Sequence, residues 1–173
     1  HRAAAFGMRV IAIRRSKHKT IPPLDWLGST DQLDQLLAES DFVVVACDMN
    51  KETIGMIGAP QLARMKPDSV IINVGRGRVI DEEALYQALK DRSIGGAVLD
   101  VWYNYIGNDK EDVWPCNYPF QDLDNVILSA HESAASPEQL ERRWKFVADN
   151  LQRVANGGQP ENQVFLGTAT AGL

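Results

Sequence analysis

The 173-residue chain carries 18 Lys and Arg against 23 Asp and Glu, a formal net charge of −5, and 45% of its residues are apolar. This is ordinary globular composition, and the acidic balance excludes the broad basic surface that nucleic acids or anionic membranes require. No apolar run approaches the roughly 20 residues of a membrane span, and two cysteines, Cys47 and Cys116, are too few for a disulfide framework, so we expect a cytoplasmic protein with reduced thiols.

Short apolar runs alternate with helix-type patterns along the chain. We expect strands at 8–13, 42–47, 70–74, 95–101 and 126–130, helices at 2–6, 30–38, 81–90 and 136–157, and helical turns at 53–57 and 60–65. The run at 42–47 is apolar throughout and the run at 70–74 is apolar except for Asn73, a pattern typical of strands buried on both faces. The Pro- and Gly-containing stretches at 21–23 and 28–30 predict loops. This alternation predicts an α/β fold with a doubly wound, Rossmann-like parallel sheet.

Two of the expected helices have clear start signals. Asp81 is a plausible N-cap for the helix at 81–90. Ser136 followed by Pro137, with Gln139 three residues after the cap, predicts the start of the last helix. One face of that helix is then marked by Leu140, Trp144, Val147, Leu151 and Val154.

Three polar residues fall at the carboxyl ends of successive expected strands: Arg76, Asp100 and His131. In a parallel sheet these ends lie along one edge, where ligands bind, so the three residues can converge. An arginine there can hold a carboxylate through two parallel hydrogen bonds, and a histidine can exchange a proton near neutral pH. Taken singly, Arg76 could equally pair with a surface acid, His131 could be a satisfied buried histidine, and Asp100 could anchor a loop.

The ordered series of motifs at 73–77 (NVGRG), 79–82 (VIDE), 99–102 (LDVW) and 125–131 (NVILSAH) resembles the D-isomer-specific 2-hydroxyacid dehydrogenases. The resemblance extends over about 5–164. It implies an oxidoreductase that transfers hydride between a nicotinamide cofactor and a small 2-oxo or D-2-hydroxy acid such as glyoxylate or hydroxypyruvate. It also implies a homodimer, and we expect no metal site.

The resemblance implies a role for each matching residue. Arg76 would bind the substrate carboxylate, and His131 would be the acid and base at the carbonyl oxygen. Asp100 would hydrogen-bond the nicotinamide carboxamide. The remaining cofactor contacts are expected from Cys47, Asp48, Thr53, Val74, Gly75 and Ser133, with Arg76 and His131 also near the cofactor.

Two residues depart from the family pattern near His131. The family places a Glu beside its catalytic histidine, and Tyr105 stands where that acid is expected. A tyrosine cannot stabilise a protonated imidazole as a carboxylate does, so we expect a different pH profile. Ala130 replaces the usual proline before the histidine. Glu132 is adjacent in sequence but is expected to point elsewhere.

The phosphate-binding pattern G-x-G-x-x-G does not occur in the sequence. We therefore expect an N-terminally incomplete chain that lacks the first strand of the nucleotide fold. In the order 3-2-1-4-5-6 the first strand is central, so its loss would leave a pair and a triplet of strands. Residues 1–135 would form the rest of the nucleotide-binding domain, and 136–173 a crossover helix and tail returning toward a substrate domain.

A basic cluster follows the first expected strand. NAD-binding folds usually carry an acid at this position for the ribose 2′-OH, whereas this chain has Arg14, Arg15 and Ser16 and no carboxylate. These residues predict NADP(H) in preference to NAD(H), although a bare charge run is more often a solvated loop.

Two other functions remain open. The chain could be a non-catalytic nucleotide-sensing module on the same fold, or an inactive fragment. The aromatic residues of the long loop are expected to serve packing, a subunit interface or the roof of the substrate pocket; they are Trp102, Tyr103, Tyr105, Trp114, Tyr118 and Phe120.

Overall fold

The computed structural model describes residues 1–15, 22–105 and 113–163, in two units, His1–Ser133 and Ala134–Leu173. The first unit contains the strands β1 (Ile11–Ile13), β2 (Trp26–Gly28), β3 (Phe42–Val45), β4 (Val70–Asn73), β5 (Gly96–Leu99) and β6 (Val126–Leu128). Its helices are α1 (Arg2–Ala5), α2 (Leu33–Glu39), α3 (Ala59–Leu62) and α4 (Glu82–Lys90). The second unit contains α5 (Pro137–Ala155).

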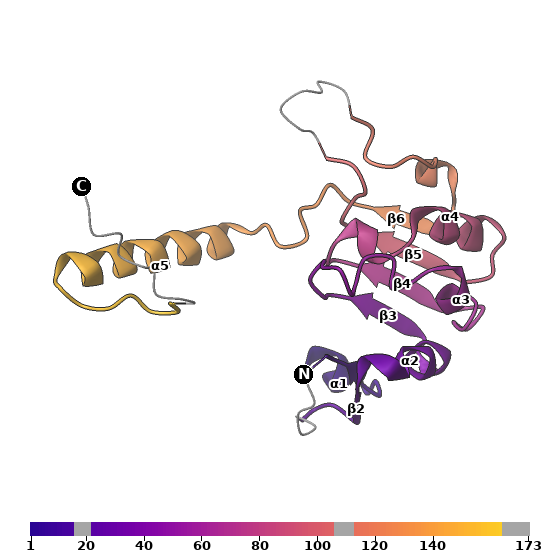
Figure 1. The fold of residues 1–173 in the computed structure, drawn as a ribbon, viewed down its shortest axis with the longest axis horizontal. Helices are drawn as coiled ribbons and strands as arrows, with labels where there is room; N and C mark the ends of the chain where they lie inside the picture. Colours follow the sequence, from indigo (N-terminus) through magenta and orange to yellow (C-terminus); the bar gives the residue numbers. More distant parts are fainter. Residues whose placement is uncertain (16–21, 106–112, 164–173) are drawn as a thin grey trace. The chain divides into compact units, whose positions relative to one another are not determined.

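All six strands pair in parallel, in two sheets (Figure 1). One sheet pairs β1 with β2, and the other has the order β3-β4-β5-β6. The predicted Rossmann-like parallel α/β fold is confirmed. A pair of strands is present as predicted, but the predicted triplet is wrong, because the other sheet has four strands. The pair contains 26–28, which was not expected to form a strand, beside β1. The strand order of this fold class places a strand between β1 and β3, and none is present there in the described part of the chain.

The larger sheet has one covered and one uncovered face within the first unit. α3 and α4 lie on the same face (Figure 1), over a core of large, fully buried side chains that includes Leu62, Ile71, Leu85, Leu89 and Leu99. On the other face the pairing register places Val44, Ile72, Val98 and Ile127 in one row. The expectation that 42–47 and 70–74 are buried on both faces is therefore wrong: Val44 is 60% exposed, and β4 alternates between buried and half-buried residues.

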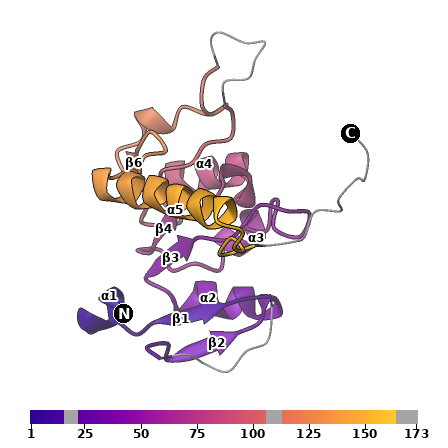
Figure 2. The ribbon, with the colours of Figure 1, turned by 90° about the vertical axis from the view of Figure 1, so that its left-hand side faces the viewer.

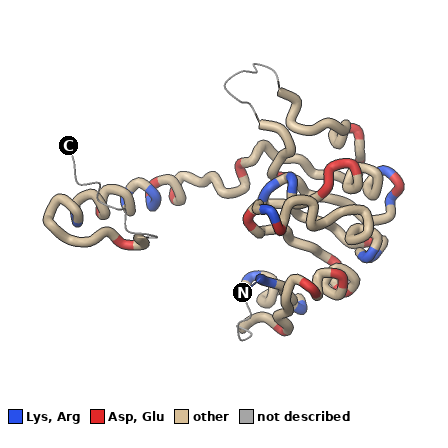
Figure 3. The backbone as a smooth tube through the Cα atoms, in the orientation of Figure 1, with Lys and Arg blue, Asp and Glu red and all other residues tan. Residues whose placement is uncertain are grey.

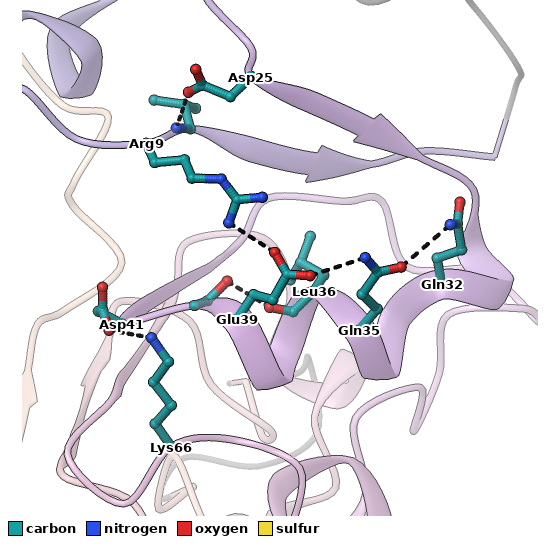
Figure 4. A network of polar contacts seen from close by, with 10 residues as sticks. Arg9, Asp25, Gln32, Gln35, Leu36, Glu39, Asp41 and Lys66 are labelled. Atoms are coloured by element: carbon teal, nitrogen blue, oxygen red, sulfur yellow. Dashed lines mark hydrogen bonds and ion pairs between the residues drawn. The ribbon is translucent and has the colours of Figure 1, made fainter.

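α2 lies between the β1–β2 pair and the larger sheet in both ribbon views (Figure 2). A polar contact ties the end of this helix to the segment before β1 (Figure 4). Arg9, just before β1, donates to Glu39 at the end of α2 at 2.8 Å, and Gln35 donates to the same carboxylate at 2.9 Å. Hydrogen bonds from Gln35 and Arg9 lower the pKa of Glu39. Beyond the helix, Lys66 pairs with Asp41 at 2.6 Å.

The expected helix starts are confirmed. Asp81 accepts a hydrogen bond from the Ala84 amide at 2.9 Å, and Ser136 accepts one from the Gln139 amide at 3.1 Å. In α5 the apolar positions are exposed, among them Trp144 at 64% and Leu151 at 68%. The expected helical turn at 53–57 is present as a hydrogen-bonded turn over 51–55, in which the Ile54 amide donates to the Asn50 carbonyl at 3.0 Å and the Met56 amide to the Thr53 carbonyl at 3.2 Å. It ends before Ile57, which forms a parallel bridge with Ile80.

Acidic and basic residues are interspersed along both units (Figure 3). Among the described helices none is long and apolar enough to cross a membrane. The end of the expected tail, 164–173, lies outside the described residues.

Candidate active site

The carboxyl ends of β3 to β6 lie in register. Val45 pairs with Asn73, Asn73 with Leu99, and Leu99 with Leu128. The chain therefore leaves these four strands at one level, with 46–48, 74–76, 100–102 and 129–131 following side by side. This is the edge at which ligands bind in open parallel sheets. It carries Arg76, Asp100 and His131, as the sequence predicted for a shared edge.

Arg76 stands on a turn fixed by a buried asparagine. Asn73 is 1% exposed; its Oδ1 accepts from the Gly75 amide at 3.1 Å and its Nδ2 donates to the Arg76 carbonyl at 3.1 Å. Arg76 has an extended backbone, with φ −144° and ψ 141°. Its guanidinium donates from Nη1 to the Gly75 carbonyl at 2.8 Å. No ion pair to Arg76 is present in the described residues, so its positive charge is available to an anion.

Gly77 brings the Arg76 turn against the segment that follows β5. A Cβ at Gly77 would lie 2.3 Å from the Trp102 carbonyl oxygen and 3.1 Å from the Tyr103 amide nitrogen, far closer than any real contact. Only glycine permits this approach of two backbones. The turn after β4 and the turn after β5 are consequently held in direct contact.

The segment after β5 in turn contacts His131. The Trp102 amide donates to the Tyr105 hydroxyl at 3.0 Å, and that hydroxyl lies 3.2 Å from Nδ1 of His131. The two rings are 5.7 Å apart between centroids and tilted by 55°. The Trp102 indole also donates to the Ser129 carbonyl at 3.0 Å. Tyr105 thus occupies the place beside the histidine that the sequence predicted for it.

Asp100 fixes the turn that carries His131. The carboxylate, 4% exposed, accepts hydrogen bonds from the Ser129 hydroxyl, the Glu132 amide (3.0 Å), and the Ser133 amide and hydroxyl (3.1 and 2.5 Å). Burial opposes its ionisation, but these hydrogen bonds outweigh burial and lower the pKa of Asp100 to about 2. His131 sits between the bonded residues with φ 61°, in the left-handed region that non-glycine residues rarely adopt.

These contacts occupy both oxygens of Asp100 with the protein's own donors. Asp100 and Ser133 were both expected to contact the cofactor, and here they bind each other. Asp100 acts on the site through the His131 turn in this arrangement.

A cavity of about 630 Å³ opens beside this chain of contacts. Its lining includes Arg76, Arg78, Trp102, Tyr105 and Trp114. Among the described residues His131 does not line the cavity itself but adjoins it through Tyr105. The two arginines can bind the charged part of a small anion, and the aromatic rings can contact an apolar part of the same molecule.

The other aromatic residues of the long loop pack against α4. Tyr86 stacks on Tyr118 with centroids 5.2 Å apart and meets Phe120 edge-on at 5.5 Å, and Tyr103 lies parallel to Phe120 at 6.5 Å. Burial and the nearby Glu82 raise the pKa of Tyr103, so it remains a neutral packing residue. The predicted packing role is confirmed for these residues.

The predicted cofactor residues that follow β3 and β4 differ in whether the protein itself already uses them. Gly75 lies at the β3–β4 boundary, where a Cβ would be 2.9 Å from the Cys47 carbonyl oxygen, and Val74 is 40% exposed beside it. Burial raises the pKa of Cys47, with Asp48 adding to the effect, so this thiol is neutral. Thr53, in contrast, is used by its own loop: its hydroxyl donates to the Asp48 carbonyl at 2.7 Å and accepts from the Asn50 amide at 2.8 Å.

The predicted phosphate-binding residues follow β1. Arg14 and Arg15 come directly after the strand, and Ser16 lies outside the described residues. The fold brings a carboxylate to this cluster that the local sequence lacks: Glu52 Oε2 lies 3.6 Å from Nη1 of Arg15. The expectation that no carboxylate is present there is wrong. Both side chains are at least 70% exposed, and such a pair is worth at most about 1 kcal/mol.

The donor set at this edge fits a dinucleotide. A nicotinamide dinucleotide needs a glycine where the backbone approaches it closely, and Gly75 provides one. It also needs an apolar surface against its ring, which Val74 exposes, and cations for its phosphates, which the arginines after β1 supply. Cys47 and Asp48 lie at the same level of the edge. No group of three or more His, Cys, Asp or Glu side chains that could hold a metal occurs among the described residues.

A family model for the NAD-binding domain of D-isomer-specific 2-hydroxyacid dehydrogenases matches residues 1–133. The chain is 38% identical over 166 residues to a glyoxylate reductase of Korarchaeum cryptofilum. The matched region covers 94% of this chain and 47% of that protein. It is 42% identical over 132 residues to glyoxylate/hydroxypyruvate reductase B of Pectobacterium carotovorum, covering 76% of this chain and 39% of that one.

Solved structures give the same result. An NADPH-dependent glyoxylate/hydroxypyruvate reductase of Sinorhizobium meliloti, in complex with NADP and sulfate, superposes with a TM-score of 0.75 at 28% identity, covering 92% of this chain and 49% of that one. The chain thus spans about half the length of the relatives it matches.

Proposed function

The chain belongs to the D-isomer-specific 2-hydroxyacid dehydrogenase family, and we propose on this basis that the protein interconverts a small 2-oxo acid and its D-2-hydroxy acid with NADP(H). The observation that carries the proposal is the continuous set of contacts from the Arg76 turn through Gly77, Trp102 and Tyr105 to His131. It supports an anion-binding group that lines the cavity and a proton-transfer group that adjoins the cavity through Tyr105.

Each group has a distinct role in the proposed reaction. Arg76 binds the substrate carboxylate through the guanidinium N–H groups that do not donate to Gly75, and places positive charge near the developing alkoxide. His131 gives a proton to the carbonyl oxygen in reduction and removes it in oxidation. Asp100 holds the turn that orients the imidazole. Val74 and Gly75 are among the residues that would hold a nicotinamide cofactor, which would supply or accept the hydride.

We favour glyoxylate or hydroxypyruvate as substrate, because the named relatives are glyoxylate and hydroxypyruvate reductases. The test is the oxidation of NADPH by the complete protein with a panel of 2-oxo acids. Arg76→Ala should reduce kcat/KM by about 10²–10³-fold, as expected for loss of a group that stabilises the transition state. Cofactor binding should be unchanged.

Arg78→Ala is the matched control, since Arg78 lines the same cavity two residues away. It should change kcat/KM by only a few-fold. Equal losses in the two variants would contradict the role of Arg76. A protein that only senses the nucleotide would bind NADPH and turn over no 2-oxo acid, and an inactive fragment would do neither.

The preference for NADP(H) rests on Arg14 and Arg15 after β1, and a relative of known structure was solved with NADP. A 2′-phosphate would need to replace only the weak, exposed contact between Arg15 and Glu52. Dissociation constants for NADPH and NADH at one salt concentration test the preference. Equal or tighter binding of NADH would refute it.

We further propose a homodimer. The apolar side chains exposed on α5 and on the uncovered face of the larger sheet support an additional buried interface. Light scattering of the complete protein should give twice the chain mass, and a monomer at micromolar concentration would contradict the proposal.

A further inference from the structure

Arg78 is the second cation of the cavity, and the reaction proposed above gives it no role. A role for Arg78 rests on that proposed reaction and adds a class of substrate that the reaction alone does not specify. The cavity, at about 630 Å³, lies within the range that holds drug-sized ligands. Glyoxylate is far smaller, so a glyoxylate bound to Arg76 leaves most of this space unoccupied.

The backbone places Arg76 and Arg78 on the same side of the turn that follows β4. The Val79 amide donates to the Arg76 carbonyl at 3.2 Å. The Gly55 amide donates to the Arg78 carbonyl at 2.8 Å. Gly77 and Val79 are buried, whereas the two arginines are exposed, and both arginines line the same cavity. The turn therefore presents two positively charged side chains to one space.

The described lining of this cavity supplies no negative charge to balance them. It includes no Asp or Glu. No ion pair to either arginine is present within residues 1–15, 22–105 and 113–163. Burial raises the pKa of Tyr103 and of Cys116, which also line the cavity, and keeps both side chains neutral. Two like charges that share a space without a counterion attract an anion with more than one charge.

The amide side chains of the cavity are already used by the protein. Asn104 Nδ2 donates to the Trp114 carbonyl and to Asn117 Oδ1, both at 3.2 Å. Asn117 Nδ2 donates to Glu82 Oε2 at 2.7 Å, and the Asn117 amide donates to the same carboxylate. Glu82 is thereby held by Asn117 and not by an arginine. The two arginines are the cationic donors that remain for a ligand.

Two arginines in one cavity suit a ligand with two carboxylates, because the planar N–H donors of a guanidinium match one carboxylate. We propose that Arg78 is a specificity-determining residue that binds the distal carboxylate of a 2-oxo dicarboxylic acid, while Arg76 binds the carboxylate beside the carbonyl. The ligand then brings one negative charge for each arginine. A phosphate ester would carry about −1.5 to −2 on its phosphate alone and exceed this balance.

Matched pairs of substrates separate charge from chain length. 2-Oxoglutarate and 2-oxopentanoate have the same carbon chain and differ in a terminal carboxylate against a methyl group. With the complete protein and NADPH, kcat/KM for 2-oxoglutarate should exceed that for 2-oxopentanoate about tenfold, as expected for one hydrogen-bonded charged contact. Oxaloacetate against 2-oxobutyrate repeats the comparison with a shorter chain. The proposal requires the preference in at least one of the two pairs.

Arg78→Gln removes the charge but keeps a polar side chain. It should lower kcat/KM for the preferred dicarboxylate about tenfold and that for its monocarboxylate partner only a few-fold. Arg64→Gln is the matched control, because Arg64 is an exposed arginine that pairs with Asp34 and is not part of the described lining. The ratio within each substrate pair should be the same in Arg64→Gln as in the unmodified protein.

Calorimetry with the complete protein saturated with NADP⁺ measures binding without turnover, because the oxidised cofactor has no hydride to give to a 2-oxo acid. The preferred dicarboxylate should bind about tenfold more tightly than its monocarboxylate partner at one salt concentration. The difference should shrink in Arg78→Gln and at higher salt. A protein that shows this binding and oxidises no NADPH would support the role of Arg78 and refute only the proposed dehydrogenase activity.

Equal kcat/KM and equal binding within both substrate pairs would overturn the proposal. A preference that survives in Arg78→Gln would also overturn it, because another cation would then bind the second carboxylate. The phosphate ester is tested with 3-phosphohydroxypyruvate against hydroxypyruvate. A larger preference in this pair than in either dicarboxylate pair would overturn the choice of a dicarboxylic acid.

Discussion

Replacing Asp100 with Asn tests whether the charge of this carboxylate holds the His131 turn. Asn has the same shape and resembles the protonated acid, so the variant removes the charge while leaving the packing intact. In the folded protein the pKa of Asp100 is lowered from 3.8 to about 2 by hydrogen bonds from the turn. Because the folded protein binds this proton less readily than the unfolded chain, ionised Asp100 stabilises the fold.

The difference between 3.8 and about 2 corresponds to about 2 kcal/mol of unfolding free energy. Asp100→Asn should lose this amount at pH 5–7. The difference from the unmodified protein should then shrink as the pH falls from about 4 toward 2, where the unmodified carboxylate is itself protonated. Urea unfolding at several pH values, followed by tryptophan fluorescence, measures both quantities.

Asp124→Asn is the matched control. Asp124 is 79% exposed and pairs with Arg92 at 2.7 Å, so its loss should cost less than about 1 kcal/mol. A loss in Asp100→Asn no larger than in Asp124→Asn, or one that is the same at pH 7 and pH 3, would refute the reasoning.

Three further changes probe neighbouring contacts. Gly77→Ala should destabilise the protein by more than about 2 kcal/mol and abolish turnover, because the new Cβ would overlap the Trp102 backbone. Gly58→Ala is the control: a Cβ there is 3.8 Å from its nearest neighbour, so the variant should be nearly neutral in the same urea unfolding measurement. Glu52→Gln should free Arg15 and tighten NADPH binding up to about fivefold in calorimetry, with no change for NADH; an equal gain for both cofactors would contradict this. Trp102→Phe removes the indole bond to the Ser129 carbonyl and should cost about 1 kcal/mol in urea unfolding, whereas an unchanged midpoint would contradict it.

The sequence predicted correctly those features that depend only on neighbouring residues, such as the helix N-caps. Asp81 and Ser136 were identifiable as N-caps because a short oxygen-bearing side chain before a helical pattern satisfies free amides whatever the tertiary context. The strand at 26–28 had no such signal, since three residues that end in a glycine are too few to show a period. Whether a strand is buried on one face or on both depends on which helices cover the sheet. The apolar composition of the strand therefore could not show that Val44 would be exposed.

The placement of the charged residues at the edge of the sheet was predictable from the sequence, whereas the contacts that support them were not. Arg76 and His131 follow strand ends, and the parallel register brings such positions together. The role of Asn73 in clamping the Arg76 turn had no signal beyond its place at the end of a strand. The Ser129 contact with Asp100 and the Glu52 contact with Arg15 join residues about 30 or more positions apart, so only the folded chain reveals them.

The account depends most on Arg76 and His131 facing one substrate. A crystal structure of the complete protein with NADP and oxalate, a non-reducible dianion about the size of glyoxylate, tests this directly. We predict that the Arg76 guanidinium binds an oxalate carboxylate and that Nε2 of His131 lies within hydrogen-bonding distance of the same molecule, with Nδ1 on Tyr105. Oxalate bound without one of these two side chains, or a His131 ring turned away from the cavity, would contradict it.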